Sequence, residues 1–257
     1  MSEHNEGEAR HVTESAERDA VCKFLDWDSK FFGLRIARLD RSRLDDVLAR
    51  EALRWCSEER IDCLYFLADS NHAATCALAE NNGFALTDVR LTFERMLVPG
   101  DDQFPPSAEV RLARESDLDS LRSIARSAHH DTRFYFDPHF DRTLCDRLYE
   151  TWIENSFHGF AQAVLVAEMD RKAVGYLTIR SKGPESQIGL LGIDDLHQGK
   201  GLGTKLIQRF LAWSMEQGAS RSTVVTQGRN VAAQRFYQRN GFVIAALELW
   251  YHRWFSP

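Results

Sequence analysis

The sequence predicts an α/β protein with a mixed β-sheet, and three observations support this fold class. Apolar runs of strand length alternate with stretches whose apolar residues recur at helical spacing. Residues 32–97 are similar to residues 190–255 when the chain is shifted by 158 positions. Between these two blocks, residues 98–108 concentrate proline, glycine and acidic side chains, as interdomain linkers do.

The composition is that of a globular protein. A chain of 257 residues with 44% hydrophobic and 27% charged residues can bury a sizeable core. The net charge of -6 argues against a general binder of nucleic acid or of anionic membranes, and no apolar run reaches membrane-spanning length. The five cysteines are scattered and lack metal-ligand spacing. We therefore expect a cytoplasmic protein without a metal.

Three regions are predicted along the chain. Residues 1–20 are rich in acidic residues and have no apolar segment, which predicts a disordered tail rather than a secretory signal. Residues 21–104 are predicted to form a smaller first domain and residues 105–257 the larger second domain, with the boundary near residue 105.

The internal repeat predicts the same supersecondary unit twice. Without a gap it aligns Leu44 with Leu202, Trp55 with Trp213, and the tripeptide 82–84 with the tripeptide 240–242, both Asn-Gly-Phe. Each copy is predicted to run strand, helix, strand, helix, strand. The remaining elements predicted for the second half are strand 109–113, helix 115–128, a polar and aromatic loop, helix 141–156, hairpin strands 161–169 and 173–181, strand 186–193 and strand 221–226.

The segment richest in chemical signals follows strand 186–193, where a glycine-rich turn opens an amphipathic helix. Glycines allow a tight turn and close approach of a ligand, and the free N–H groups of a helix start favour phosphate. Lys200 and Lys205 add positive charge. The spacing fits neither a Rossmann loop nor a P-loop, and a simple glycine-rich turn remains the alternative. A bulky side chain at Gly201 or Gly203 is expected to enter the phosphate site.

Two motifs resemble the coenzyme A elements of the GCN5-related N-acetyltransferases (GNAT): Gln198-x-x-Gly201-x-Gly203 and Asn230-x-x-Ala233-x-x-Phe236-Tyr237-x-x-x-Gly241-Phe242. The resemblance implies a GNAT fold, with a mixed and mostly antiparallel sheet, preceded by a smaller degenerate GNAT-like half. It also implies acetyl-CoA as co-substrate. The residues implied in its binding are Leu191, Gly192, Ile193, Gln198, Gly199, Lys200, Gly201, Leu202, Gly203, Thr204, Asn230, Ala233, Phe236 and Tyr237.

The same resemblance implies distinct roles within this set. Loop amides hold the pyrophosphate, the edge of strand 188–193 pairs with the pantetheine, Asn230 contacts the pantetheine arm, and Tyr237 lies near the thioester sulfur. A phenol at Tyr237 suits protonation of the leaving thiolate, whereas core packing is the favoured interpretation of Phe236. Backbone amides near Leu191 to Ile193 are candidates for stabilising the oxyanion.

Direct transfer in a ternary complex is favoured over a covalent cysteine intermediate, because four of the five cysteines lie in the first half. The general base is left open, since strand 186–193 contains no glutamate. Water is one alternative. The side chains considered for this role are His129, His130, Asp131, Asp137 and His139.

Three further segments, residues 24–33, 130–140 and 250–255, resemble the bacterial TDP-fucosamine acetyltransferases. The acceptor implied is a nucleotide sugar of the dTDP-4-amino-4,6-dideoxygalactose type. Aromatic rings in the loop can cover a sugar or base, and Arg133 can bind a diphosphate. The predicted substrate-binding residues are His130, Arg133, Tyr135 and Asp137.

Other functions remain open. The acceptor could be another small amine or a protein N-terminus, and a non-catalytic coenzyme A sensor or scaffold is the alternative outside enzymes. In the first copy of the repeat, Asp40–Asp45 replaces the glycine-rich loop, His72 replaces Asn230 and Ala79 replaces Tyr237. That copy is predicted to support the sheet, the acceptor cleft or a subunit contact. No nucleic-acid or membrane partner is expected, and a homodimer is left open.

Overall fold

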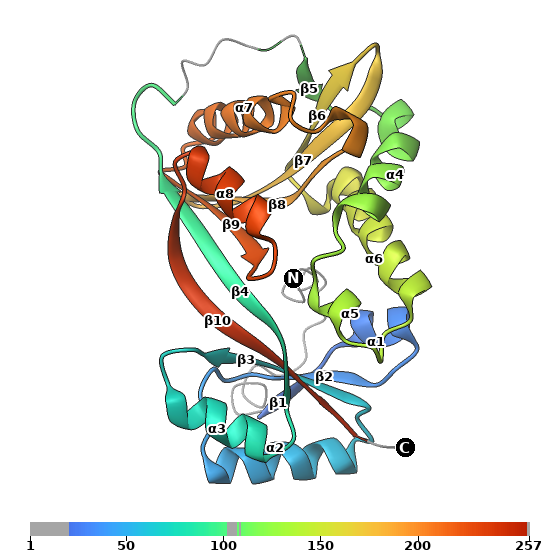
Figure 1. The fold of residues 1–257 in the computed structure, drawn as a ribbon, viewed down its shortest axis with the longest axis vertical. Coiled ribbons are helices and arrows are strands. Elements are labelled where there is room, and N and C mark those ends of the chain that lie inside the picture. The colour runs from blue at the N-terminus through green and yellow to red at the C-terminus, as the bar shows by residue number, and fades with distance from the viewer. Residues whose placement is uncertain (1–20, 102–106, 108, 256–257) are drawn as a thin grey trace. The chain divides into compact units, whose positions relative to one another are not determined.

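A computed structural model describes residues 21–101, 107 and 109–255 (Figure 1). The predicted tail at 1–20 and most of the linker between 102 and 108 lie outside these residues. The described strands form one mixed sheet in the order β1-β2-β3-β10-β4-β9-β8-β7-β6-β5, which confirms the predicted α/β class.

The chain divides into two compact units, and they do not follow the predicted boundary near residue 105. Of the described residues, the first unit comprises 21–90, 136–141 and 247–255, and the second comprises those within 91–135 and 142–246. The chain therefore passes from one unit to the other inside two long strands. The predicted boundary near residue 105 separates the two copies of the repeat along the sequence, and it stays a prediction. The compact units are a different division of the chain.

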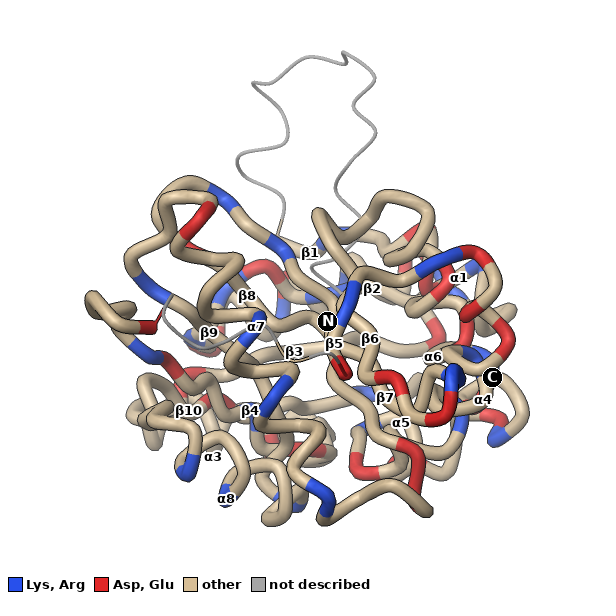
Figure 2. Tube along the Cα trace, turned by 90° about the horizontal axis from the view of Figure 1, so that it is seen from above, with Lys and Arg blue, Asp and Glu red and all other residues tan. Residues whose placement is uncertain are grey.

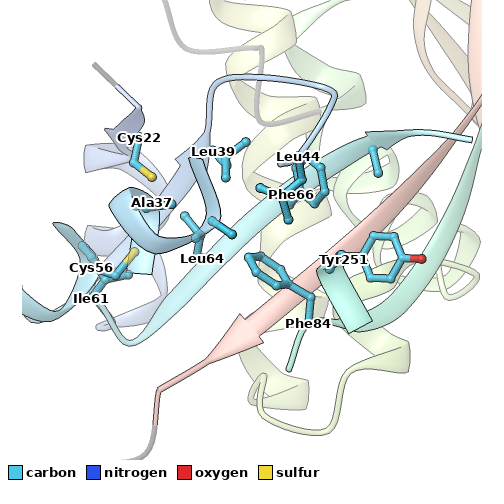
Figure 3. Close-up of a cluster of buried hydrophobic side chains, with 14 residues drawn as sticks. Cys22, Ala37, Leu39, Leu44, Cys56, Ile61, Leu64, Phe66, Phe84 and Tyr251 are labelled. Carbon is cyan, nitrogen blue, oxygen red and sulfur yellow. The ribbon is translucent and has the colours of Figure 1, made fainter. Parts of the chain in front are cut away.

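The first unit contains the elements of the first repeat copy and a core of its own. Figure 3 shows this core, where Leu64 and Phe66 pack with Phe84 and Tyr251. Its elements are β1 (Cys22–Phe24), α1 (Asp26–Phe32), β2 (Ile36–Leu39), α2 (Asp46–Glu58), β3 (Cys63–Asp69), α3 (Ala73–Asn81), the first part of β4 (Ala85–Met96) and the last part of β10 (Val243–Trp254).

In the second unit, α7 covers one side of the strands, and α4 and α6 cover the other (Figure 1). The predicted hairpin is present, with Asp170 and Arg171 at φ 50° and 64°, as a tight turn with two left-handed residues requires. The elements are β5 (Val110–Leu112), η2 (Glu115–Asp117), α4 (Leu118–Ala128), α5 (Arg133–Phe136), α6 (Arg142–Asn155), η3 (Ser156–Phe160), β6 (Ala163–Met169), β7 (Lys172–Lys182), β8 (Glu185–Ile193), η4 (Asp195–His197), α7 (Leu202–Glu216), β9 (Arg221–Gln227) and α8 (Val231–Arg239).

The internal repeat recurs in these element bounds. The strand β9, the helix α8 and the strand β10 begin and end 158 residues after β3, α3 and β4 respectively. Even the turn glycines agree, since Gly83 has φ 77° and Gly241 has φ 81°. The two copies therefore share a backbone plan as well as a sequence pattern.

The two copies differ at the start of their first helix. In α2 the Asp45 carboxylate accepts hydrogen bonds from the backbone N–H groups of Val47 (2.9 Å) and Leu48 (2.8 Å). In α7 the N-cap is Gly201, and no side chain caps the helix. The first copy thus satisfies its helix start with its own carboxylate, whereas α7 leaves N–H groups without a side-chain cap.

We expect Asp45→Ala to lower the free energy of unfolding by about 1 kcal/mol, because it removes an N-cap that satisfies two N–H groups. Urea denaturation monitored by circular dichroism measures the change. Glu51→Ala, on the exposed middle of the same helix, is the control and should stay within about 0.5 kcal/mol of the unsubstituted protein. Equal stability of the Asp45 variant and the unsubstituted protein would contradict the capping role.

Lys and Arg residues are interspersed with Asp and Glu residues over the described chain (Figure 2). Within the described part of the chain, no helix is both long and apolar enough to cross a membrane.

Candidate active site

The candidate site starts where the parallel strands β8 and β9 stop pairing. Their register runs from Glu185 opposite Arg221 to Ile188 opposite Val224. Both strands continue beyond this point, β8 to Ile193 and β9 to Gln227. Among the strands described, the edge of β8 from residue 189 to 193 is therefore not paired with β9. An unpaired strand edge offers N–H and C=O groups to a ligand of extended shape.

A β-bulge lies at the same point in the neighbouring pair of β7 and β8. The register moves from Leu177 opposite Leu191 to Ile179 opposite Ile188, so Thr178 faces two residues. The Leu190 N–H donates to Thr178 Oγ1 at 2.8 Å, and a Cβ on Gly189 would lie 2.7 Å from that oxygen. A bulge re-aims the backbone locally. A glycine inside a strand pattern, here Gly189, is the sequence signal for such a bulge, but strand 186–193 was predicted without one.

The glycine-rich loop adopts backbone angles that favour glycine. Gly199 and Gly201 have φ 74° and 80°, in the left-handed region, and a Cβ at either position would meet no atom within 4 Å. Gly203 is different, because a Cβ there would lie 3.1 Å from the Phe236 ring. A side chain at Gly203 would therefore point at Phe236 and not, as expected from the sequence, into the phosphate site. This glycine allows α7 and α8 to approach closely.

Other loop side chains separate into structural and available groups. Gln198 Nε2 donates to Asp195 Oδ1 at 2.8 Å and to Ile193 O at 3.3 Å, which ties the loop to the end of β8. Lys205 forms an ion pair with Glu109, and this pair holds the pKa of Glu109 below its usual range. Lys200 is exposed and has no ion-pair partner among the described residues. Lys200 is therefore the loop cation most available to an anion.

Asn230 caps α8, with its Oδ1 accepting from the Ala233 N–H at 2.9 Å. The carbonyl side of the amide is used by the helix, and the Nδ2 donor has no partner within the described residues. His72 occupies the matching position in the first copy and accepts from Thr75 N at 3.3 Å. The capping role is thus common to both copies, whereas an available amide donor belongs to the second copy.

Tyr237 lies on α8 among Phe93, Phe236 and Phe242, with ring centroids 5.4 to 6.0 Å away. The residue is 6% exposed. Its hydroxyl makes no hydrogen bond to another described residue, so it is left for a ligand. Burial raises the pKa of Tyr237, which keeps the phenol protonated at neutral pH. The geometry suits a proton donor.

Two of the four predicted acceptor residues lie together at the start of the loop. His130 is exposed and lies edge-on to the Tyr135 ring, with centroids 4.8 Å apart. The Tyr135 hydroxyl donates to Asp146 Oδ1 at 2.6 Å. Arg133 is only 4% exposed, and its guanidinium lies 4.5 Å from the centre of the Phe134 ring. This burial argues against the predicted contact of Arg133 with a diphosphate.

Asp137, the fourth predicted acceptor residue, is a buried structural carboxylate of the first unit. Its Oδ2 accepts from His252 Nδ1 at 2.6 Å and Trp254 Nε1 at 2.8 Å, and its Oδ1 accepts from the His139 backbone N–H at 3.1 Å. Burial pushes the pKa of Asp137 upward, but hydrogen bonds from His252, Trp254 and His139 outweigh it and hold the pKa below its usual range. These contacts occupy the carboxylate and argue against its predicted roles as acceptor ligand or general base.

We expect Asp137→Asn to lower the free energy of unfolding by about 2 kcal/mol at pH 7, because hydrogen bonds to a charged carboxylate are lost. A depressed pKa stabilises the fold above the pKa of the unfolded chain, about 3.9, and this contribution disappears as pH falls through the lower folded value. The gap between variant and unsubstituted protein should therefore narrow below about pH 4. Urea denaturation at a series of pH values checks this, and a constant gap would contradict it.

Comparison with known proteins identifies a family and several relatives of this chain. Residues 120–242 match the Acetyltransferase (GNAT) family. The chain is 28% identical over 232 residues to dTDP-fucosamine acetyltransferase of Escherichia coli O6:H1, covering 89% of this chain and 96% of that protein. It is also 28% identical over 153 residues to the spore coat polysaccharide biosynthesis protein SpsD of Bacillus subtilis, covering 60% of this chain and 53%, about half, of that protein.

The fold of this chain is also similar to that of a solved structure. A tandem GNAT protein from the clavulanic acid biosynthesis pathway, solved without acetyl-CoA, has a TM-score of 0.56 and 13% identity. The match covers 88% of this chain and 77% of the chain in that structure. The N-terminal region therefore resembles tandem GNAT structures in its fold. The family match identifies residues 120–242 as a domain of the GNAT superfamily of acyl-CoA N-acyltransferases.

Proposed function

We propose that this protein transfers the acetyl group of acetyl-CoA directly to the amino group of a nucleotide-activated amino sugar of the dTDP-4-amino-4,6-dideoxygalactose type. The observation that carries the proposal is the parting of β8 and β9 after Ile188 and Val224, beside a helix start capped by Gly201 alone. A free strand edge and an uncapped helix start suit the two ends of one ligand, a pantetheine arm and a pyrophosphate. The near-full-length relative named for dTDP-fucosamine supports the acceptor class.

The residues of this chain would act as follows. Loop amides from Gly199 to Thr204 and the Lys200 ammonium hold the pyrophosphate. The edge of β8 at Leu191 to Ile193 aligns the pantetheine, with Asn230 Nδ2 as a further donor, and presents amides to the developing oxyanion. The Tyr237 hydroxyl gives its proton to the sulfur as the carbon–sulfur bond breaks.

Direct transfer is supported by the state of Cys145. Cys145 is the only cysteine in the described part of the second unit, and it is fully buried. Its Sγ lies 3.3 Å from the Phe134 carbonyl oxygen. A thiol in this position does not meet an acetyl donor at the strand edge, so an acetyl-cysteine intermediate there is disfavoured.

An acceptor panel tests the proposal. The protein is incubated with acetyl-CoA and, separately, a dTDP-4-amino sugar, the same sugar without nucleotide, a polyamine and a peptide with a free N-terminus. Release of free thiol is followed in each. We expect the dTDP-4-amino sugar to give the highest kcat/KM. Activity on the peptide or polyamine with none on the nucleotide sugar would overturn the acceptor class, and acetyl-CoA binding without transfer to any amine would favour a sensor.

A further inference from the structure

His129 follows the last residue of α4 and opens the loop predicted to bind the acceptor. Its imidazole is held by two tyrosines of the second unit. The ring stacks on Tyr149 of α6, with centroids 4.6 Å apart and planes at 20°, and Nε2 lies 2.8 Å from the hydroxyl of Tyr176 on β7. These contacts come from two different elements and fix both the plane and the rotation of the ring.

Tyr176 connects this histidine to the free end of β8. A Cβ on Gly192 would lie 3.1 Å from the Tyr176 ring and 3.2 Å from Ile124 of α4, so the ring and the helix occupy the space that a side chain would need. Gly192 belongs to the segment of β8 that the proposed function assigns to the pantetheine. His129 is therefore one side chain away from the backbone at which transfer is proposed, on the α4 side of the strand.

The hydrogen bond decides which ring nitrogen carries the proton. Tyr176 is fully buried, and within the described residues its hydroxyl has His129 Nε2 as its hydrogen-bond partner. A buried O–H without an acceptor costs about 1–3 kcal/mol, so Tyr176 donates and Nε2 accepts. The neutral ring then carries its proton on Nδ1. His129 is partly exposed, and Nδ1 makes no hydrogen bond to another described residue, so this N–H is the one left for a ligand.

The imidazole is neutral at physiological pH. Burial, with a smaller contribution from the neighbouring His130, lowers the pKa of His129 to about 4. Tyr149 and Tyr176 are the titratable groups that contact the ring, and Arg126 on the last turn of α4 is paired with Glu150 of α6. A neutral N–H donor does not repel an acceptor that arrives as an ammonium ion.

We propose that His129 Nδ1–H donates a hydrogen bond to an acceptor oxygen beside the amino group and so fixes the amine against the thioester. The inference rests on the proposed function and deepens it, because it assigns the acceptor side of the site. It also excludes His129 as the general base in this arrangement, since the outward nitrogen already carries a proton and the inward one accepts from Tyr176.

Two amide substitutions separate the two ring nitrogens. Asn places its amide nitrogen near the position of Nδ1 and keeps the outward donor, whereas Gln places its amide near Nε2 and keeps an acceptor for Tyr176. We expect His129→Gln to raise the acceptor KM about 10-fold with the acetyl-CoA KM unchanged, and His129→Asn to retain most of the acceptor affinity. The reverse order, with Gln active and Asn impaired, would make His129 only a support for Tyr176 and overturn the proposal.

Nitrogen NMR of the imidazole gives a readout that does not depend on activity. Between about pH 5 and 8 we expect Nδ1 protonated and Nε2 unprotonated in the unsubstituted protein, and a changed tautomer population in Tyr176→Phe. Protonated Nε2 in the unsubstituted protein would overturn the proposal. So would an acidic limb of kcat/KM that disappears in His129→Gln, because that limb would identify a general base.

Calorimetry with acetyl-CoA distinguishes failure of this inference from failure of the proposed function. If the unsubstituted protein does not bind acetyl-CoA, the proposed function fails, whatever tautomer the NMR experiment finds. If acetyl-CoA binds and transfer to the acceptor is observed, but neither amide substitution changes the acceptor KM, the role of His129 alone is overturned.

Discussion

Tyr237→Phe should lower kcat by about 10²- to 10⁴-fold while acetyl-CoA affinity and stability change little. The substitution removes one oxygen and leaves the ring among Phe93, Phe236 and Phe242. The hydroxyl has no hydrogen-bond partner within the described residues, so no buried group is left unsatisfied by its removal. Steady-state kinetics over a pH range, with calorimetry for acetyl-CoA, measures the two effects separately.

Tyr251→Phe is the matched control. This tyrosine is also buried, but its hydroxyl contacts Glu80 of the first unit at 3.2 Å. It should leave kcat unchanged. Because burial raises the pKa of Tyr237, its ionisation should produce no alkaline loss of activity below about pH 10. A variant with unchanged kcat at every pH, under conditions where chemistry limits the rate, would make Tyr237 a packing residue and place the acid elsewhere.

Gly201→Val should weaken acetyl-CoA binding by about 100-fold or more. At φ 80° a β-branched residue is strained, and relief of this strain moves the N–H groups that begin α7. Loss of two hydrogen bonds to a charged phosphate, each worth about 1.5–3 kcal/mol, costs at least about 3 kcal/mol of binding free energy. This corresponds to more than a 100-fold loss of affinity, since about 1.4 kcal/mol is tenfold. Calorimetric titration with acetyl-CoA measures the affinity.

Gly218→Val is a closely matched control for this experiment. Gly218 follows the other end of α7, has φ 81°, and like Gly201 has open space around a Cβ. The substitution therefore introduces similar backbone strain at a distance from the proposed phosphate site. It should reduce stability but leave acetyl-CoA affinity unchanged. Equal losses of affinity in both variants would mean that the loop is not the anion site.

Local features of this protein could be predicted from the sequence because their causes are local. Periodicity and turn residues determine the hairpin at Asp170 and Arg171, and the repeat predicts the elements that share bounds in the two copies. The glycine-rich loop was predicted as an anion site from residue types alone, and its left-handed glycines and uncapped helix agree with that interpretation.

What the sequence could not predict depends on partners far along the chain. Asp137 lies in an aromatic loop and was predicted to be an acceptor ligand, but its partner His252 is 115 residues away. His129 was considered as a base, yet its properties depend on Tyr176, which is 47 residues away. The division of β4 and β10 between two compact units is likewise set by pairing, and strand periodicity does not encode pairing partners.

The different caps of α2 and α7 have a thermodynamic consequence. The first unit carries the anion for its helix start covalently, as the Asp45 side chain, so the cap of α2 needs no ligand from solution. The second unit would obtain its anion from solution, so its folding and its coenzyme A binding are linked through the ligand concentration. A hundredfold excess of ligand over its dissociation constant contributes about 2.7 kcal/mol. Under the proposed function, the concentration of coenzyme A would therefore contribute to the stability of the second unit.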